Sequence, residues 1–133
     1  MKILITGNET KKNFHNILES IYLLFKKFPK HKIFVDKYIK SVNNINKKNF
    51  IDIYETTECI DFVICIGGDG ALLSSVRRMK KKQLPVLGIH IGNLGFLNQL
   101  THKNYIHELS VLLDKENIEY EYRPLLHADF LNI

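Results

Sequence analysis

The sequence predicts an α/β fold in which an open, mostly parallel sheet is flanked by helices. Short apolar runs rich in β-branched residues alternate along the chain with segments whose apolar residues recur every three or four positions. This alternation is typical of strands and helices that follow one another in a parallel sheet. The apolar runs are continuous rather than interrupted at every second position, which indicates strands covered on both faces.

The first third of the chain predicts a strand, a helix and a second strand. Residues 3–7 are an apolar run that closes with a threonine and a glycine. Residues 14–28 carry apolar side chains at helical spacing, and Pro29 stops this helix because proline cannot continue the backbone hydrogen bonds. Residues 32–36 fit a second short strand.

The following stretch leaves alternatives open. Residues 37–48 are polar and rich in Lys and Asn, which fits either a weak helix or a long loop. Residues 50–54 fit either a short strand or a turn. This part of the chain therefore adds little to the predicted sheet.

The second half begins with the clearest strand, because residues 62–66 are five consecutive apolar side chains. Glycines at 67, 68 and 70 end the strand abruptly. A helix is predicted after them, with three lysines near its C-terminus, where the helix dipole favours cations. Its apolar positions are Leu72, Leu73, Val76 and Met79.

The remaining segments continue the alternation. Residues 85–89 predict another buried strand, and residues 92–97 predict a loop with apolar anchors. Thr101 is the expected N-cap of a last helix that ends near Lys115. The apolar face of that helix consists of Tyr105, Ile106, Leu109, Leu112 and Leu113. Residues 118–133 have strand character again.

Composition and charge narrow the class of protein. The 133 residues are 45% hydrophobic and 25% charged, which is typical of a folded domain and not of a disordered tail, a collagen-like repeat or a simple coiled coil. The net charge is +5, but the lysines are scattered, so we expect a solvated surface and no nucleic-acid partner. The two cysteines, and the lack of a signal-peptide or membrane-span pattern, lead us to expect a cytoplasmic protein with no membrane partner.

The glycine-rich loop at residues 67–70 is the first candidate site. It lies between a buried strand and the start of a helix, where ligands gather in parallel sheets. Glycines let a ligand approach the backbone, and the free N–H groups of the loop and helix start favour an anion. The loop therefore predicts a phosphate cradle, although it has neither the Walker pattern nor the dinucleotide fingerprint.

Asp69 is the informative residue of this loop. A carboxylate touching a phosphate would repel it, so Asp69 holds a metal ion, accepts a hydroxyl proton or faces away as a turn residue. The first two are kinase roles, because phosphoryl transfer needs alignment, a cation and a group that takes the hydroxyl proton. The four loop residues alone leave the turn alternative open, since Asp-Gly pairs favour tight turns.

Two segments of the chain resemble the NAD kinase family. Residues 64–73, Ile-Cys-Ile-Gly-Gly-Asp-Gly-Ala-Leu-Leu, are similar to the Gly-Gly-Asp-Gly box of that family. Residues 87–97, Leu-Gly-Ile-His-Ile-Gly-Asn-Leu-Gly-Phe-Leu, resemble its second box, and residues 123–126, Arg-Pro-Leu-Leu, resemble the segment leading out of its N-terminal domain. Lipid kinases and phosphofructokinases share the first box, whereas the two boxes at this spacing are much more specific.

The resemblance implies an enzyme that uses ATP and a divalent metal cation, magnesium, to phosphorylate the adenosine ribose 2′-hydroxyl of NAD and make NADP. It also implies the α/β fold of the N-terminal domain shared by NAD kinases and diacylglycerol kinases. Asp69 matches the family acid that takes the hydroxyl proton or organises the reacting groups. Asp69 is therefore the expected catalytic residue.

The resemblance also implies the residues that surround the ligands. Gly68 and Gly70 match residues whose backbone approaches the phosphates or the substrate. Leu73 and Phe96 match apolar residues that line the nucleotide pocket. His90 falls where the family carries Asn or His beside the substrate, although a lone His at a strand end is as often a structural residue.

The domain organisation follows from the same resemblance. It implies an α/β nucleotide- and phosphate-binding domain at 1–123 and the start of a β-rich C-terminal domain, largely absent here, at 124–133. The chain stops inside an apolar run, so we expect it to lack the remainder of a longer protein, and a complete family member to form a homo-oligomer. The family's Asn-Glu substrate motif lies in the second domain, and the pair at Asn8-Glu9 comes too early. We therefore expect the 133-residue chain alone to be nearly inactive.

Ala71 departs from the family, which usually has Thr after the box, and so removes a hydroxyl that could cap the helix or touch a phosphate. This leaves two alternatives: a non-catalytic nucleotide-binding module, or a lipid or sugar kinase that shares the loop. Arg77, Arg78 and the lysines at 80–82 fit a solvated helix end better than phosphate contacts. Cys65 is expected to be an inert thiol, and the histidines lack metal-ligand spacing, so we expect no metal-binding residues.

Overall fold

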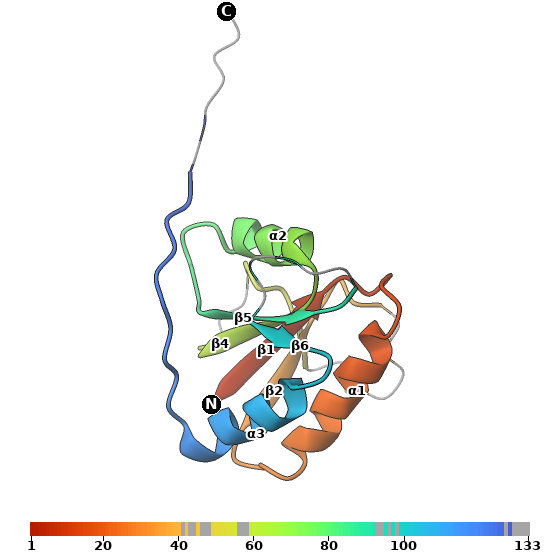
Figure 1. Cartoon of the computed structure of the whole chain (residues 1–133). Coiled ribbons are helices and arrows are strands. Elements are labelled where there is room, and N and C mark those ends of the chain that lie inside the picture. Colours follow the sequence, from red (N-terminus) through yellow and green to blue (C-terminus); the bar gives the residue numbers. More distant parts are fainter. Residues whose placement is uncertain are drawn as a thin grey trace, which may run out of the picture.

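The computed structural model describes residues 1–40, 42, 45, 49–55, 59–92, 95, 97, 99–126 and 128. In this part of the chain a six-stranded sheet lies between helices on both of its faces (Figure 1). In chain order the elements are β1 (Lys2–Gly7), α1 (Phe14–Phe25), β2 (Lys32–Asp36), β3 (Phe50–Ile51), β4 (Phe62–Gly67), α2 (Asp69–Met79), β5 (Val86–His90), β6 (Leu100–Thr101) and α3 (Tyr105–Lys115).

The strands are all parallel, and their order in the sheet is β3-β2-β1-β4-β5-β6. The first three strands extend the sheet in one direction from β1, and the last three extend it in the other direction from β4. The order therefore reverses between β1 and β4. In open α/β sheets, ligands bind in the crevice at the carboxyl ends of the strands at such a switch point.

The two faces of the sheet are buried under different helices. Along β1, Ile3 and Ile5 pack in the cluster that contains α1 and α3, whereas Leu4 between them packs with Met79 of α2. All four side chains are fully buried. A strand covered on both faces needs an apolar side chain at every position, which explains the continuous apolar runs in the sequence.

The predicted fold class is confirmed, and the four long strands lie within a residue or two of the predicted ranges. Helix α1 differs, because it ends at Phe25 rather than near Phe28. The N–H groups of Lys27 and Phe28 donate to carbonyls three residues earlier, at 3.0 Å each, so the chain tightens into a turn. Phe28 still packs against the core from this turn.

Thr101 is not the N-cap of the last helix, and that prediction is wrong. Thr101 lies in β6, paired with His90, and Asn104 occupies the N-cap position of α3. The Asn104 Oδ1 atom accepts hydrogen bonds from the backbone N–H of Thr101 at 2.8 Å and from its hydroxyl at 3.2 Å. The two-residue strand was missed because it is too short to show a sequence period. On the predicted face of α3, Tyr105, Leu109 and Leu113 are buried. Leu112 is partly buried, and Ile106 is 37% exposed.

Residues 50–54 contain both structures that the sequence left open, since the two-residue strand β3 runs into a turn. Of the ambiguous stretch 37–48, residues 37 and 38 form a turn, and positions 41, 43, 44 and 46–48 lie outside the described residues.

The strand predicted after residue 118 does not form within 118–126. These residues are extended without a paired neighbour in the described part of the chain, and Tyr122 and Leu126 are 88% and 98% exposed (Figure 1). Strand propensity alone does not make a strand, because the backbone groups need a partner in the sheet. Residues 127 and 129–133 lie outside the described residues, and the domain boundary at 123/124 stays a prediction.

No described helix is both long and apolar enough to cross a membrane.

Candidate functional site

The loop between β4 and α2 depends on two glycines that bring backbone segments close together. A Cβ atom on Gly7, at the end of β1, would lie 2.0 Å from the carbonyl oxygen of Ile66. A Cβ atom on Gly67 would lie 2.7 Å from the Cβ of Ala71 in the first turn of α2. Side chains at either position would separate β1, β4 and the start of α2. The absence of side chains at Gly7 and Gly67 therefore lets β1, β4 and the start of α2 pack closely at the switch point.

The N-terminus of α2 lies directly after this crossing. Gly68 is the N-cap in an extended conformation, and Asp69 is the first residue of the helix. Ala71 is the third helical residue, so the hydroxyl that the family carries there is not the N-cap group. A Cβ atom on Gly68 or Gly70 would meet nothing within 4 Å, which leaves the backbone here open to close approach.

Asp69 reaches from the start of α2 to the loop that follows β5. Its Oδ1 atom accepts a hydrogen bond from the backbone N–H of Leu97 at 3.0 Å. Gly95 of the same loop lies against the carboxylate, since a Cβ there would be 2.4 Å from Oδ1. Asp69 is half-buried, so its carboxylate is held at the carboxyl edge of the sheet without being enclosed in the protein.

His90 is the last residue of β5 and pairs with Gly67 in the register of the sheet. It is only 8% exposed, and its Nε2 donates to the carbonyl oxygen of Gly92 at 2.9 Å. Its Nδ1 atom is buried without a hydrogen-bond partner among the described residues. Leu73 lies 44% exposed on α2, so it does not belong to the buried helix face that the sequence predicted. Phe96 lies outside the described residues.

A pocket of about 350 Å³ opens at the switch point. It is bounded by the end of β1, the residues after β2 and one side of α2. The residues of the candidate loop that line it are Gly70 and Ala71, whereas Asp69 is not among the lining residues. The other polar groups in its wall include Asn8, Glu9 and Ser74. The glycine loop thus has two sides, with the pocket on one and the Asp69 carboxylate on the other.

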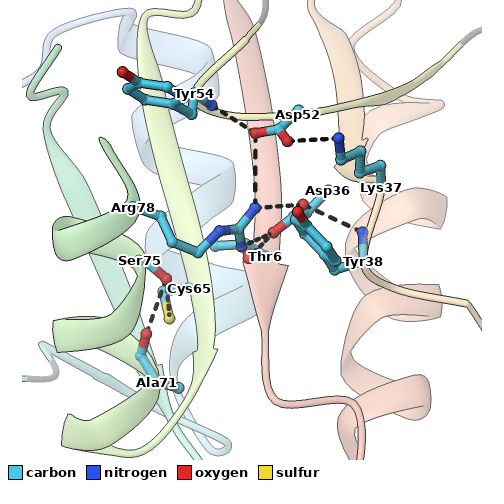
Figure 2. A network of polar contacts seen from close by, with 10 residues as sticks. All are labelled: Thr6, Asp36, Lys37, Tyr38, Asp52, Tyr54, Cys65, Ala71, Ser75 and Arg78. Carbon is cyan, nitrogen blue, oxygen red and sulfur yellow. Dashed lines mark hydrogen bonds and ion pairs between the residues drawn. The ribbon is translucent and has the colours of Figure 1, made fainter. Parts of the chain in front are cut away.

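The far wall of the pocket is an ion pair between α2 and β2 (Figure 2). Both Nη atoms of Arg78 bind the Asp36 carboxylate, with Nη2 2.9 Å from Oδ1. The Thr6 hydroxyl donates to Oδ2 of the same carboxylate at 2.6 Å. The hydrogen bond to Asp36 raises the pKa of Arg78 above its ordinary value and outweighs the burial that lowers it. Asp36 is 1% exposed, so its charge is balanced inside the protein.

A second layer of contacts holds this wall at its rim. The Arg78 guanidinium lies 4.5 Å from the centre of the Tyr38 ring, and Lys37 binds Asp52 at 2.7 Å (Figure 2). Burial by itself raises the pKa of Asp52, but the hydrogen bonds from Lys37 and from the N–H of Tyr54 outweigh it, and the pKa is lowered. The rim therefore consists of charged groups that hold one another in place.

Arg78 corrects the sequence prediction of a solvated helix end, because it is held by Asp36 in the pocket wall. Thr6, Asn8 and Asp36 also line the pocket, and they were not predicted as site residues. A usable signal was present, since each lies at the carboxyl end of a predicted strand. Their convergence depends on the strand order, which puts the ends of β1 and β2 beside α2.

Cys65 is buried on β4 beneath α2, as the sequence predicted for an inert thiol. Burial raises the pKa of its thiol, and the Ser75 hydroxyl, 3.5 Å from Sγ, offsets this in part. No group of three or more potential metal ligands among His, Cys, Asp and Glu occurs in the described part of the chain.

Comparison with known proteins was made on sequence and on structure. The family described as "ATP-NAD kinase N-terminal domain" matches residues 4–117. The NAD kinase of Aeromonas salmonicida is 32% identical over 97 residues, which cover 73% of this chain and 33% of that protein. The NAD kinase of Shewanella frigidimarina is 39% identical over 79 residues, covering 59% and 25%. The chain thus spans a third or less of the length of these relatives.

A solved structure, yeast NADH kinase complexed with NADH, shares the fold. It matches with a TM-score of 0.64 at 19% identity, over 86% of this chain and 38% of that one. At this level of identity the likeness concerns the arrangement of strands and helices alone.

Proposed function

The chain belongs to the ATP-NAD kinase family, and on that premise we propose that its protein transfers the terminal phosphoryl group of ATP to the adenosine ribose 2′-hydroxyl of NAD. The observation that supports this most directly is the two-sided glycine loop. A polar pocket lies on one side of it and a positioned carboxylate lies on the other. Phosphoryl transfer needs a donor site and an acceptor site that adjoin each other, so that the reacting groups can align.

The pocket at the switch point suits the phosphates of the donor. The first backbone N–H groups of any helix have no carbonyl partner in the preceding turn, and the positive end of the helix dipole lies there, so the N-terminus of α2 favours anions. Gly70, Ala71 and Ser74 line the pocket along this helix. Asp36 does not repel an anion there, because Arg78 neutralises it. In this proposal the donor phosphates lie along the start of α2.

The acceptor side is the edge that carries Asp69. In the mechanism we propose, the 2′-hydroxyl of the ribose binds next to this carboxylate and passes its proton to it as the phosphoryl group arrives. Leu73, His90 and Phe96 are proposed to surround the acceptor, on the strength of the family resemblance. Phosphoryl transfer asks for little more than alignment and charge stabilisation, so these residues mainly position the acceptor.

A divalent cation is implied by the family, and the residues present suit one that enters with ATP. Magnesium bound to a nucleotide usually takes one or two protein carboxylates besides the phosphates. Glu9 in the pocket wall is proposed for this role. When bound, the cation neutralises charge that develops on the transferred phosphoryl group.

The predictions of a cytoplasmic location and a homo-oligomer rest on the resemblance and the sequence pattern.

The test is NADP formation from NAD, ATP and magnesium by the protein expressed from its gene, compared with the Asp69→Asn variant. We expect kcat to fall about 100-fold or more, because the amide cannot accept the hydroxyl proton. The matched control is Asp114→Asn on the exposed side of α3, which should leave kcat unchanged. Unchanged turnover in the Asp69 variant would remove Asp69 from the mechanism.

Ala71 supports the second candidate, a non-catalytic nucleotide-binding module. It lines the pocket, where the usual family hydroxyl would add a polar contact. Calorimetry that detects ATP binding while no NADP forms would favour this function. A lipid or sugar kinase would leave NAD untouched in this assay and would transfer phosphate from ATP only when its own lipid or sugar acceptor is added.

A further inference from the structure

We propose that Gly95 is a positioning residue for the Asp69 carboxylate, and that its missing side chain is the space in which the carboxylate lies. This inference rests on the proposed function, in which Asp69 takes the proton of the acceptor hydroxyl. It adds a second loop to the site, because Gly95 follows β5 while Asp69 begins α2. The two residues are far apart in sequence and meet only in the folded chain.

The contact between these residues is closer than any side chain would permit. A Cβ atom built on Gly95 would lie 2.4 Å from Oδ1, 2.8 Å from Cγ and 2.9 Å from Oδ2 of Asp69. All three nearest atoms belong to the carboxylate, so a methyl group at this position would collide with that group first. While the carboxylate lies in this position, only glycine fits opposite it.

The backbone N–H of Leu97 is the second group of this loop that contacts the Asp69 carboxylate. It donates to Oδ1 of Asp69 at 3.0 Å, two residues after the glycine that contacts the same oxygen. The loop after β5 therefore touches the carboxylate and hydrogen-bonds it from within one short segment. A hydrogen bond from a backbone N–H to a carboxylate oxygen favours one orientation of the acid, and proton transfer requires an oriented carboxylate.

The glycines of the Gly-Gly-Asp-Gly box do not share this constraint. A Cβ at Gly68 or Gly70 would meet nothing within 4 Å, although these residues flank Asp69 directly. The space that Asp69 needs is thus supplied by the second box. The Gly-Gly-Asp-Gly box therefore supplies the carboxylate, and the second box, which lies later in the sequence, supplies the space and the hydrogen bond that position it.

The expected effect of Gly95→Ala is a loss of turnover out of proportion to any loss of stability. The atoms that must yield are the end of a short, half-buried side chain, so the fold can accommodate the methyl group by moving the carboxylate. A displacement on the order of 1 Å costs about 100-fold in rate when it misplaces a catalytic group. The KM for ATP should stay within about twofold, because the donor pocket lies on the other side of the loop.

The experiment is a double-mutant cycle on the protein expressed from its gene, with Gly95→Ala, Asp69→Ala and the combination. We expect Gly95→Ala alone to lower kcat about 100-fold and to shift the amide NMR signal of Leu97, whose acceptor has moved. In the Asp69→Ala background the added methyl group meets no carboxylate, so it should change neither kcat nor unfolding further. If Gly95→Ala fails to fold, recovery of folding in the combined variant supports the proposal.

Gly92→Ala is the control for strain in the same loop. Gly92 has φ +92°, so alanine there is strained, yet its Cβ would meet nothing within 4 Å. It should lower stability without shifting the Leu97 signal through Asp69. The inference is overturned if Gly95→Ala leaves kcat and the Leu97 amide as they are, or if the effects of Gly95→Ala and Asp69→Ala simply add. An active Asp69→Asn variant would instead contradict the proposed function. The unfolding and NMR measurements would still test whether Gly95 positions the Asp69 carboxylate.

Discussion

Asp36 is the residue on which the pocket wall depends. Its carboxylate is almost completely buried at the end of β2, and it accepts hydrogen bonds from the Thr6 hydroxyl, the backbone N–H of Tyr38 and both Nη atoms of Arg78. A buried charge is tolerated only when it is paired and hydrogen-bonded. The pair therefore lets a carboxylate line an anion-binding pocket without repelling the anion.

The first prediction at this scale concerns Arg78→Met. We expect it to lower the free energy of unfolding by about 3 kcal/mol, because it leaves the Asp36 charge buried and unpaired. Urea denaturation measures the change. The double variant Asp36→Asn/Arg78→Met should recover most of the loss, since the amide needs no counter-charge. Equal instability of the single and double variants would mean that Arg78 acts through packing rather than charge.

The Asp69 carboxylate differs from that of Asp36 in its burial and in its partners. It is half-buried at the edge of the sheet, with one oxygen bound by the N–H of Leu97 and with Gly95 against its carboxylate. The structure therefore holds one carboxylate neutralised and rigid, and another positioned where a ligand can reach it. The two roles follow from their partners rather than from the residue type.

At the scale of elements, the ends of β2 and β3 are joined by an ion pair. Lys37 and Asp52 follow the two strands directly, and their side chains meet at 2.7 Å. The hydrogen bond with Asp52 raises the pKa of Lys37 above 10.5, while the pKa of Asp52 is lowered below 3.8. The pair is therefore charged on both sides across the whole neutral range.

This pair predicts a pH dependence of stability. A lowered carboxyl pKa contributes stability above 3.8 that is lost as the pH falls through the folded value, and a raised lysine pKa contributes stability that is lost only as the pH rises beyond 10.5. We expect Lys37→Met to lower the free energy of unfolding only slightly at neutral pH, because Lys37 is 42% exposed and solvent screens the pair. The difference from the unmodified protein should shrink below pH 3.8. A difference that persists in acid would assign the effect to the lysine stem, and thermal unfolding at each pH measures it.

At the scale of the whole molecule, the strand order reverses between β1 and β4, and that single reversal creates the pocket. The first strand supplies its Gly7 turn, the second strand its Asp36, and the helix after the fourth strand its N-terminus. In the proposed function, these described elements form the donor side of the site.

The prediction at this scale separates binding from turnover. We expect the 133-residue chain to bind ATP in calorimetry, and to make NADP at least about 100-fold more slowly than a complete family member, because acceptor alignment supplies that much of the rate. The reason is that the chain spans only 25–33% of the length of the relatives described above. The Arg78→Met variant is the control for binding through the pocket. Robust NADP formation by this chain would contradict the prediction.

Local pattern determined the elements of this protein. The apolar runs and the helical spacing predicted the four long strands and the three helices, because burial on two faces or on one stripe imposes a period that the sequence must carry. The strand character after residue 118 did not lead to a strand within 118–126. The Gly-Gly-Asp-Gly loop was predicted between β4 and α2 for the same reason, as an interruption between two periodic segments. The two-residue strands β3 and β6 carry no period, and β6 was missed.

Tertiary structure alone decided which distant residues share a site. Asp36 meets Arg78 across 42 positions and Asp69 meets Leu97 across 28, and no local pattern encodes either contact. These pairs come together because the strand order places β2 beside β1 and β5 beside β4. Strand pairing is a free-energy choice among whole arrangements of the chain, so the sequence shows what each segment becomes while the packed sheet decides what each segment touches.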